Sequence, residues 1–300
     1  MSESRTRVTV VGEVLVDLLW RSGATELRAV PGGSPANVAV GLHRLERPAT
    51  LLTTWGDDPP GVLVAAHLGR IGVDVRRVPA GSGRTTVALA HLGDDGGATY
   101  DFLAAWDPRE LPVPDDTAVL HTGSLAVVVE PGAARVRDLC RAQRQNGVTV
   151  AADLNVRPAV QPDRNAYRAA CLALAGSVDV LKASDEDLAW LHPGVPPADA
   201  ARLLLDAGPR LVVVTLGARG ALAVTAAHEV RVAAETEVVD TVGAGDAFQA
   251  ALLDAVAGQG GPPTDPGVLS AVLTHCASAA SVTCTRPGAD PPTRAELAAL

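Results

Sequence analysis

The chain has 300 residues, of which 47% are hydrophobic and 20% are charged, and its formal net charge at pH 7 is -9. A chain of this length and apolar content can bury a large core, so we expect one domain, residues 1–300, rather than two equal domains. The acidic balance and the lack of any run rich in lysine or arginine exclude nucleic acid as a partner class.

Cysteine usage and hydropathy indicate where the protein works. Cys140, Cys171, Cys276 and Cys284 show no metal-ligand spacing and lie mostly in apolar runs, which predicts reduced and buried thiols. The sequence shows no signal peptide and no run of 18 apolar residues. We therefore expect a cytoplasmic enzyme without a membrane partner.

The first apolar run, residues 7–19, reads as one buried strand that ends in polar residues. Asp17 then falls just past the carboxyl end of this strand, where open α/β sheets bind ligands. An acid in an apolar stretch is either a surface loop residue or a ligand for a substrate, and local rules leave both open.

A helix start follows in the segment Pro31–Leu42. Two glycines precede Ser34, which we expect to be the N-cap, and Pro35, which we expect at the first helical position. On local rules alone this is simply a well-capped helix.

The middle of the chain alternates between strand and helix patterns. Residues 50–55 predict a strand, residues 61–69 a helix, and residues 84–92 and 98–103 a hairpin closed by the turn Gly-Asp-Asp-Gly-Gly. Strands and helices then alternate in βαβ fashion, which predicts a mainly parallel sheet with helices on both faces. The further elements that we expect are 118–122, 132–146, 148–153, 165–175, 178–181, 184–191, 198–207, 210–215, 237–239, 247–257 and 268–282.

The segment Asp240–Phe248 lies between a strand-like and a helix-like run. Its three small residues, Gly243, Ala244 and Gly245, let the backbone turn tightly and let a ligand approach the main chain. The start of the following helix presents free N–H groups and the positive end of its dipole, which favour a bound anion. Asp246 is therefore either an ordinary cap near the first helical position or a base held beside a bound anion.

Two motifs give the chain a family resemblance. DTVGAGDAF at residues 240–248 resembles the C-terminal signature of the PfkB, or ribokinase-like, carbohydrate kinases, and GGSPANVAVGLHRL at residues 32–45 resembles their N-terminal signature. The resemblance covers nearly the full chain, from Gly12 to about Pro292. It implies a three-layer α/β sandwich with a mainly parallel sheet, and a small β-sheet lid formed by parts of residues 16–30 and 74–105.

The resemblance implies a catalytic centre. In that family the aspartate of the GAGD motif is the catalytic base, and the preceding amides form the anion hole for the transferred phosphoryl group. Phosphoryl transfer needs an in-line hydroxyl, an acceptor for its proton and donors aimed at the charged oxygens. Asp246 would then be the base, and Gly243, Ala244 and Gly245 the anion hole. ATP and Mg²⁺ are the implied cofactors, and backbone groups about Asp240 would bind a monovalent cation such as K⁺.

The resemblance also assigns residues to the sugar. Asp17, in a GE-x-L-x-D pattern, and Asn37 would hydrogen-bond sugar hydroxyls, while the two glycines before the helix would let the sugar approach the backbone. Some relatives hold the sugar through an acid at the position of Glu130. The implied sugar-binding set is Asp17, Gly32, Gly33, Asn37, Glu130 and Arg157.

The assignment of Arg157 comes from the pattern D-x-N-x-R at residues 153–157, which is typical of the fructokinase and 2-keto-3-deoxygluconate kinase branch. In that branch the arginine lies near substrate and phosphates. Alternation along an extended strand end would send Asp153, Asn155 and Arg157 to the same side. The alternative is a solvated strand end.

Two further segments resemble nucleotide- and metal-binding parts of the family. LKASDED at residues 181–187 resembles the region around N-x-x-E, with an aspartate in place of the glutamate unless Glu186 takes that role. Its Ser184, in place of Asn, is equally a good N-cap, which needs no metal. T-x-G-x-x-G at residues 215–220 resembles the nucleotide loop, and a histidine lies in the helix near adenine, although such a residue is more often structural. The implied nucleotide-binding set is Ser184, Asp187, Thr215, Gly217, Gly220 and His275.

Together the motifs look most like bacterial fructokinases, which predicts ATP-dependent phosphorylation of fructose to fructose 6-phosphate. A 2-keto-3-deoxygluconate kinase should offer an extra arginine or tyrosine near the lid to bind the carboxylate of its substrate. Tyr100 lies there, but no arginine does. We therefore keep this activity, and that of other PfkB sugar or nucleoside kinases, as the second alternative. A non-catalytic sugar sensor is disfavoured because Asp246 and its glycines are present. A dinucleotide dehydrogenase is disfavoured because no G-x-G-x-x-G follows the first strand. The oligomeric state is open between a monomer and a homodimer paired through the lid.

Overall fold

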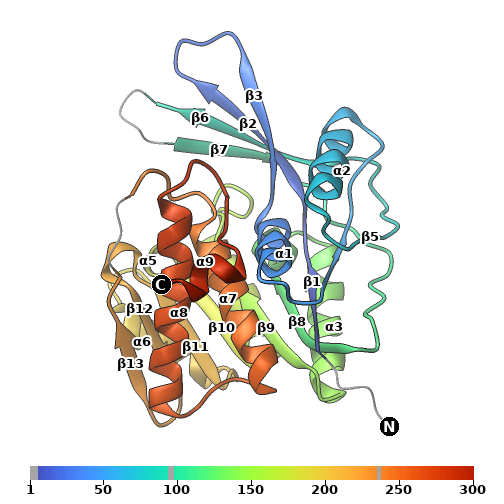
Figure 1. Cartoon of the computed structure of the whole chain (residues 1–300). Helices are drawn as coiled ribbons and strands as arrows, with labels where there is room; N and C mark the ends of the chain where they lie inside the picture. Colours follow the sequence, from blue (N-terminus) through green and yellow to red (C-terminus); the bar gives the residue numbers. More distant parts are fainter. Residues whose placement is uncertain (1–5, 94–97, 235–237) are drawn as a thin grey trace.

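Two sheets of different size organise the chain (Figure 1). A computed structural model describes residues 6–93, 98–234 and 238–300. Over this part of the chain, helices cover both faces of the larger sheet, and the smaller sheet stands over one of its ends. The predicted α/β sandwich with a second, small sheet is confirmed.

The larger sheet is mainly parallel with an antiparallel edge. Its strands in the described residues are β1 (Arg7–Val11), β4 (Ala49–Thr53), β5 (Val75–Arg77), β8 (Thr117–Gly123), β9 (Thr149–Asp153), β10 (Val180–Ser184), β11 (Leu211–Thr215), β12 (Ala221–Val224) and β13 (Glu229–Val232). They lie in the order β13-β12-β11-β10-β9-β8-β1-β4-β5, and only the β11–β12 and β12–β13 pairs are antiparallel. The carboxyl ends of the parallel strands therefore meet at one edge, where such sheets bind ligands.

The smaller sheet consists of β2 (Leu15–Arg21), β3 (Leu27–Gly32), β6 (Thr86–Leu92) and β7 (Ala98–Leu103) in the order β3-β2-β6-β7, within the described residues. β6 and β7 pair antiparallel as the hairpin pattern predicts, and their turn, 94–97, lies outside the described residues. β5 joins the larger sheet, so β6 and β7 are the strands that come from residues 74–105.

The structure corrects the prediction of one strand over residues 7–19. The run is divided between β1 and β2, which belong to different sheets. A Cβ on Gly12 would lie 2.3 Å from the ring of Pro35, so the next helix approaches the backbone closely where the chain leaves the larger sheet. As a result Asp17 lies in the middle of β2, rather than past the end of a strand.

Helices form the outer layers. In the described residues they are α1 (Ser34–Arg44), α2 (Pro59–Ile71), α3 (Gly132–Gln145), α4 (Arg164–Ala175), α5 (Asp185–Leu191), α6 (Pro197–Asp206), α7 (Ala244–Gln259), α8 (Pro266–Cys284) and α9 (Arg294–Ala298), with 3-10 turns η1 (Ser124–Val127) and η2 (Gly217–Arg219). α1, α7 and α8 contact one face of the larger sheet, and α3, α5 and α6 contact the other.

Each parallel strand feeds two cores. In β11, Leu211 and Val213 belong to the core beneath α1, α7 and α8, whereas Val212 and Val214 belong to the core beneath α3 to α6. All four are fully buried. Burial on both faces is why these strands read as continuous apolar runs in the sequence.

One helix and one expected strand need comment. α8 is long and apolar enough to cross a membrane by length and composition, although Ser, Thr and His interrupt its apolar residues. The helix packs on α7, β12 and β13, as a core helix does. The expected strand 237–239 does not form at Val238 and Val239, and Glu237 lies outside the described residues. Val239 instead donates its N–H to the carbonyl of Cys284 at the end of α8.

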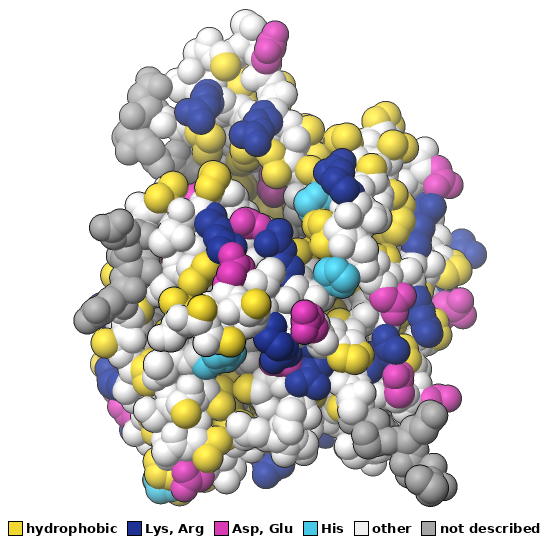
Figure 2. Space-filling view, in the orientation of Figure 1, with side chains coloured by type: hydrophobic (Ala, Val, Ile, Leu, Met, Phe, Trp, Pro, Cys, Tyr) yellow, Lys and Arg dark blue, Asp and Glu magenta, His cyan; other side chains and the backbone are white. Residues whose placement is uncertain are grey.

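Basic and acidic side chains are interspersed on the face shown in Figure 2. The four cysteines are buried and free, as predicted.

Two helical glycines provide a matched pair of substitutions. A Cβ on Gly41 of α1 would lie 2.6 Å from the Cβ of Ala250 in α7, whereas a Cβ on Gly69 of α2 would meet nothing within 4 Å. We expect Gly41→Ala to lower the free energy of unfolding by about 1–3 kcal/mol, because the two helices must move apart. Gly69→Ala should raise it by about 0.5–1 kcal/mol through helix propensity. Denaturant unfolding checks both, and equal effects of the two substitutions would contradict the close α1–α7 contact.

Candidate active site

The starts of α1 and α7 meet at the carboxyl edge of the larger sheet, around the carboxylate of Asp246. Ser34 Oγ donates to Asp246 Oδ1 over 2.6 Å, and Asn37 Nδ2 donates to Asp246 Oδ2 over 2.8 Å. Both oxygens of the carboxylate are thus held by side chains that lie more than 200 residues earlier in the chain. The structure therefore joins the two sequence motifs at one acid.

Both helices begin at a glycine in a positive-φ conformation. Gly33 is the N-cap of α1 with φ 108, and Gly243 is the N-cap of α7 with φ 77. Ser34 is thus the first residue of its helix and not the cap, which leaves its hydroxyl for Asp246. α7 begins at Ala244, three residues earlier than the start at 247 expected from the sequence, so Asp246 is the third residue of the helix rather than a residue near its first position.

The electrostatic environment of Asp246 contains opposing effects. Burial raises the pKa of this carboxyl, while the hydrogen bonds from Ser34 and Asn37 and the charges of Lys182 and Arg157 lower it. A carboxyl with a raised pKa, placed at a helix start beside free amides, is suited to accept a proton next to a bound anion.

Asp153 and Lys182 form a buried ion pair in the same region. Lys182 Nζ lies 2.6 Å from Asp153 Oδ2, and both side chains are 4% exposed. Burial raises the pKa of Asp153 to about 6, even though Lys182 lowers it. The predicted alternation of three side chains on one side is wrong, because β9 ends at Asp153 and Asn155 has a φ of 40°.

Arg157 instead connects the two sheets electrostatically. Asp17 on β2 is half-buried; burial raises its pKa to about 6, and the charge of Arg157 lowers it. The same arginine acts on Asp246. A Cβ on Gly32 would lie 3.2 Å from Asp17 Oδ2, so a side chain at that position would crowd this carboxyl. Asn37 thus contacts Asp246 directly, Arg157 acts on both Asp17 and Asp246, and Gly32 and Gly33 lie between Asp17 and the start of α1.

The carboxylate of Glu130 is engaged elsewhere. It accepts from the backbone N–H of Ala134 over 3.0 Å and from Arg137 over 2.9 Å, both in α3. No contact of Glu130 in the described residues is with another predicted sugar-binding residue, so its role in sugar binding stays a prediction.

Ser184 and Asp187 form the capping box of α5. Ser184 Oγ accepts from the N–H of Asp187, and Asp187 Oδ2 accepts from the N–H of Ser184. The other oxygen, Asp187 Oδ1, accepts from the N–H of Val156 over 2.7 Å. The capping alternative is confirmed, and both oxygens of Asp187 are committed to backbone groups, one of them in the loop that carries Arg157.

The other predicted nucleotide residues lie at the end of β11, in and after η2, and on α8. Thr215 ends β11, and Gly217 begins η2 with φ 57 and open space where a side chain would stand. Gly220 is explained by packing, because a Cβ there would lie 2.0 Å from the carbonyl oxygen of Val232. His275 is exposed on α8.

Asp240 fastens the loop before α7. Its Oδ1 accepts from the N–H of Val242, and its Oδ2 accepts from the N–H of Gly288 over 2.8 Å. The described residues contain no group of three or more His, Cys, Asp or Glu side chains that could hold a metal ion. A cation at this loop would therefore depend on main-chain carbonyl groups or on the bound phosphates.

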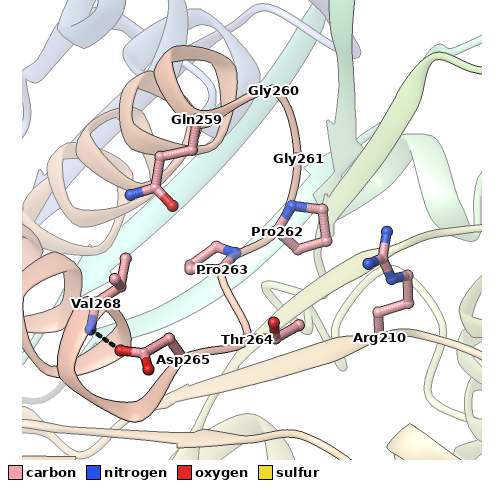
Figure 3. Close-up of a pocket in the computed structure, with 9 residues that line it drawn as sticks. All are labelled: Arg210, Gln259, Gly260, Gly261, Pro262, Pro263, Thr264, Asp265 and Val268. Atoms are coloured by element: carbon pink, nitrogen blue, oxygen red, sulfur yellow. Dashed lines mark hydrogen bonds between the residues drawn. The ribbon is translucent and has the colours of Figure 1, made fainter.

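A hollow on the surface lies away from this chemistry. It is lined by the loop from Gln259 to Asp265, by Val268 and by Arg210, which precedes β11 (Figure 3). Arg210 stands at the amino end of its strand, opposite the edge where Asp246 lies. None of the predicted site residues lines this hollow.

Sequence reasoning missed three residues here. Ser34 was taken as a helix cap, although its spacing of three from Asn37 places both on one face of a helix. Lys182 is the only lysine in the chain, but no local pattern marks it as the partner of Asp153. Glu13 is 1% exposed at the end of β1, and nothing in its apolar surroundings distinguishes it from a surface acid.

Comparison with known proteins gives one family throughout. Residues 5–295 match the model of the pfkB family carbohydrate kinases. Fructokinase-1 of Zea mays is 30% identical over 320 residues, which span 100% of this chain and 99% of the relative. A fructokinase of Salmonella typhimurium is 32% identical over 293 residues, 94% of each chain. A solved fructokinase double mutant from Vibrio cholerae O395, with fructose, ADP and potassium ion bound, has a TM-score of 0.81 at 26% identity and covers 100% of this chain and 99% of that one.

Glu13 should make stability depend on pH. Burial raises its pKa from 4.5 to about 7, against hydrogen bonds that include the N–H of Leu125. Between these values the folded chain binds more protons at Glu13 than the unfolded chain does, so its contribution to stability falls as pH rises. We expect Glu13→Gln to be more stable than wild type at pH 8 by on the order of 2–3 kcal/mol, and to lose this advantage near pH 4.5.

Thermal unfolding of wild type and Glu13→Gln across pH 4.5–8 tests this. Glu110→Gln, at an exposed acid, is the matched control and should show no such trend. A difference between Glu13→Gln and wild type that does not change with pH would contradict the raised pKa.

Proposed function

Because this chain belongs to the pfkB family of carbohydrate kinases, we propose that it transfers the γ-phosphoryl group of ATP to a primary hydroxyl of fructose, giving fructose 6-phosphate. The observation that carries the proposal is the carboxylate of Asp246, held from two sides by Ser34 and Asn37 at the start of α7. The fructokinases of Zea mays and Salmonella typhimurium, and the fructose-bound enzyme of Vibrio cholerae, support fructose as the sugar.

In this proposal Asp246 accepts the proton of the attacking hydroxyl. The backbone amides of Gly243, Ala244 and Gly245, together with the dipole of α7, stabilise the negative charge of the transferred group. Because the carboxylate has its own hydrogen bonds to α1, its orientation is fixed before the sugar arrives, which reduces the entropy lost on reaching the reactive geometry.

The sugar lies between the two sheets. Asp17 from the smaller sheet and Asn37 from α1 accept or donate hydrogen bonds to its hydroxyls, and the glycines before α1 admit it close to the backbone. Leu15 and Ala88 of the smaller sheet pack on Leu125 of η1, which gives this side of the site an apolar contact. A sheet in this position acts as a lid that keeps water from competing as acceptor.

ATP binds along the loops after β10 and β11. Mg²⁺ would be held mainly by the phosphates of ATP and would neutralise their charge, since the described residues provide no acidic cluster for it. A monovalent cation such as K⁺ would meet carbonyl groups near Asp240, because both carboxylate oxygens of Asp240 are already hydrogen-bonded. We also infer that the enzyme works in the cytoplasm, as a monomer or as a homodimer paired through the smaller sheet.

Asp246→Asn is the first test. We expect saturable ADP release with fructose in the wild type, and a loss of kcat in the variant of roughly 10²–10⁴-fold or more, because a general base is removed. The assay compares fructose, ribose, 2-keto-3-deoxygluconate, glucose and adenosine. Asp254→Asn, at a buried acid farther along α7, is the control for damage to the helix and should keep kcat within a few-fold.

The alternatives give different results in the same assay. Turnover with 2-keto-3-deoxygluconate alone would overturn the choice of fructose and leave the kinase. Binding of ATP or a sugar without any turnover would overturn the reaction and favour a sensor. Undiminished kcat in Asp246→Asn would remove Asp246 as the base.

Ser34→Ala should shift the pH dependence of the reaction. The hydrogen bond from Ser34 favours the ionised form of Asp246, so its loss raises the pKa of that carboxyl. Asp246 is active as a base only when ionised, so we expect the acidic limb of the kcat/KM profile to move to higher pH while activity at alkaline pH recovers. A profile with an unchanged acidic limb would argue against Asp246 as the proton acceptor.

A further inference from the structure

Lys182 stands out in a chain whose other basic residues, histidine apart, are all arginine. It lies in β10 with its ammonium buried against Asp153, at the carboxyl edge of the larger sheet. Burying two charges carries a large desolvation cost for each ion, and such a pair seldom adds net stability. A buried pair at this place therefore points to a role in the site beyond folding.

The ammonium lies next to the start of α7. A Cβ built on Gly245 would be 3.8 Å from Lys182 Nζ, so any side chain at Gly245 would contact it. The charge of Lys182 also acts on His121 of β8, whose pKa is lowered to about 3 by burial and by that charge. His121 is therefore neutral at pH 7, and its Nδ1 lies 3.3 Å from the amide of Gln249 in α7. Lys182 thus places a fixed positive charge between the sheet and this helix.

Negative groups gather about this charge. The negative charges of Asp187 and Asp246 each raise the pKa of Asp153. One oxygen of Asp153 accepts from Lys182, and the other, Oδ1, is buried without a hydrogen-bond partner in the described part of the chain. The charge of Lys182 lowers the pKa values of two of these acids, Asp153 in β9 and Asp246 in α7.

A lysine suits this position better than an arginine. Its ammonium is compact and has three donors, whereas a guanidinium is planar, larger and fixed in its donor directions. With both side chains of the pair 4% exposed and Gly245 close by, the site has room for the smaller group.

We propose that Lys182, held by Asp153, is a positioning residue for phosphoryl transfer, whose buried charge beneath the Gly243–Asp246 turn keeps Asp246 ionised and favours a negative group in the anion hole. The inference rests on the proposed kinase function. The groups that face Asp246 are Lys182 from β10, Asp153 and Arg157 from β9 and the loop after it, and the neutral Ser34 and Asn37 from α1.

The sign of the effect follows from this arrangement. Lys182 lowers the pKa of Asp246, so removing the ammonium lets burial raise that pKa further. In Lys182→Met the acidic limb of the kcat profile should therefore move to higher pH by about one unit or more. At neutral pH we expect kcat to fall by roughly 10²-fold, and part of the loss should persist above the shifted limb because the anion hole has lost a nearby positive charge.

The kinetic experiment compares Lys182→Met, Lys182→Arg and Arg144→Met, with fructose and ATP, across pH 5–9. Arg144 pairs with Asp179 just before the opposite end of β10, so its variant reports the loss of an ion pair remote from the site. Lys182→Arg keeps the charge and should keep the wild-type acidic limb, even if kcat falls. Arg144→Met should lower the unfolding temperature and leave the limb unchanged. A wild-type acidic limb in Lys182→Met, or an equal shift in Arg144→Met, would overturn the proposal.

A second measurement needs no turnover and separates this inference from the kinase assignment. Thermal unfolding of Lys182→Met is compared in the wild-type and Asp246→Asn backgrounds between pH 5 and pH 9. If Lys182 supports the charge of Asp246, its loss should lower the unfolding temperature less in the Asp246→Asn background, and the gap should widen as pH rises. Equal losses in both backgrounds would overturn the inference, whereas failure of every sugar to react would overturn only the proposed function. If Lys182→Met does not fold, the same comparison with Asp153→Asn decides the question.

Discussion

The two hydrogen bonds from α1 to Asp246 are the constraint on which the candidate site depends. They require the starts of α1 and α7 to lie side by side, and Gly41 permits this because no side chain separates it from Ala250. They also require each helix to begin at a glycine, so that the chain can turn sharply at the sheet edge. Packing, backbone conformation and chemistry are therefore fixed by the same contact.

Charge balance at the sheet edge explains much of the remaining arrangement. Glu13, Asp17, Asp153 and Asp246 all have pKa values raised by burial, and few basic side chains oppose them. In the proposed function such a site should prefer neutral polyols to acids, since another carboxylate would add to the repulsion. The anionic partner, ATP, must be met by amides, a helix start and a metal ion rather than by a basic pocket.

The sequence predicts the parts of this protein that local patterns control. The parallel strands are buried on both faces, so they appear in the sequence as continuous apolar runs. The two glycine-rich motifs identify Asp246 and Asn37. Features that depend on long-range contacts could not be predicted from the sequence. One of them is the division of residues 7–19 between two sheets, which depends on the approach of Pro35 to Gly12. The Asp153–Lys182 pair is formed by neighbouring strands whose register no local pattern reveals. The engagement of Asp187 with the N–H of Val156 likewise depends on tertiary structure.

The connection between β1 and β2 limits how the smaller sheet can move. It consists of Gly12, Glu13 and Val14, all of them buried, so the strand that carries Asp17 is joined almost directly to the middle of the larger sheet. A connection of three buried residues cannot act as a flexible linker between the two sheets. The smaller sheet should therefore swing as a lever about a pivot at Glu13, and the arc travelled by each residue of β2 should grow with its distance from that pivot, leaving Asp17 almost stationary while Arg21 moves farthest.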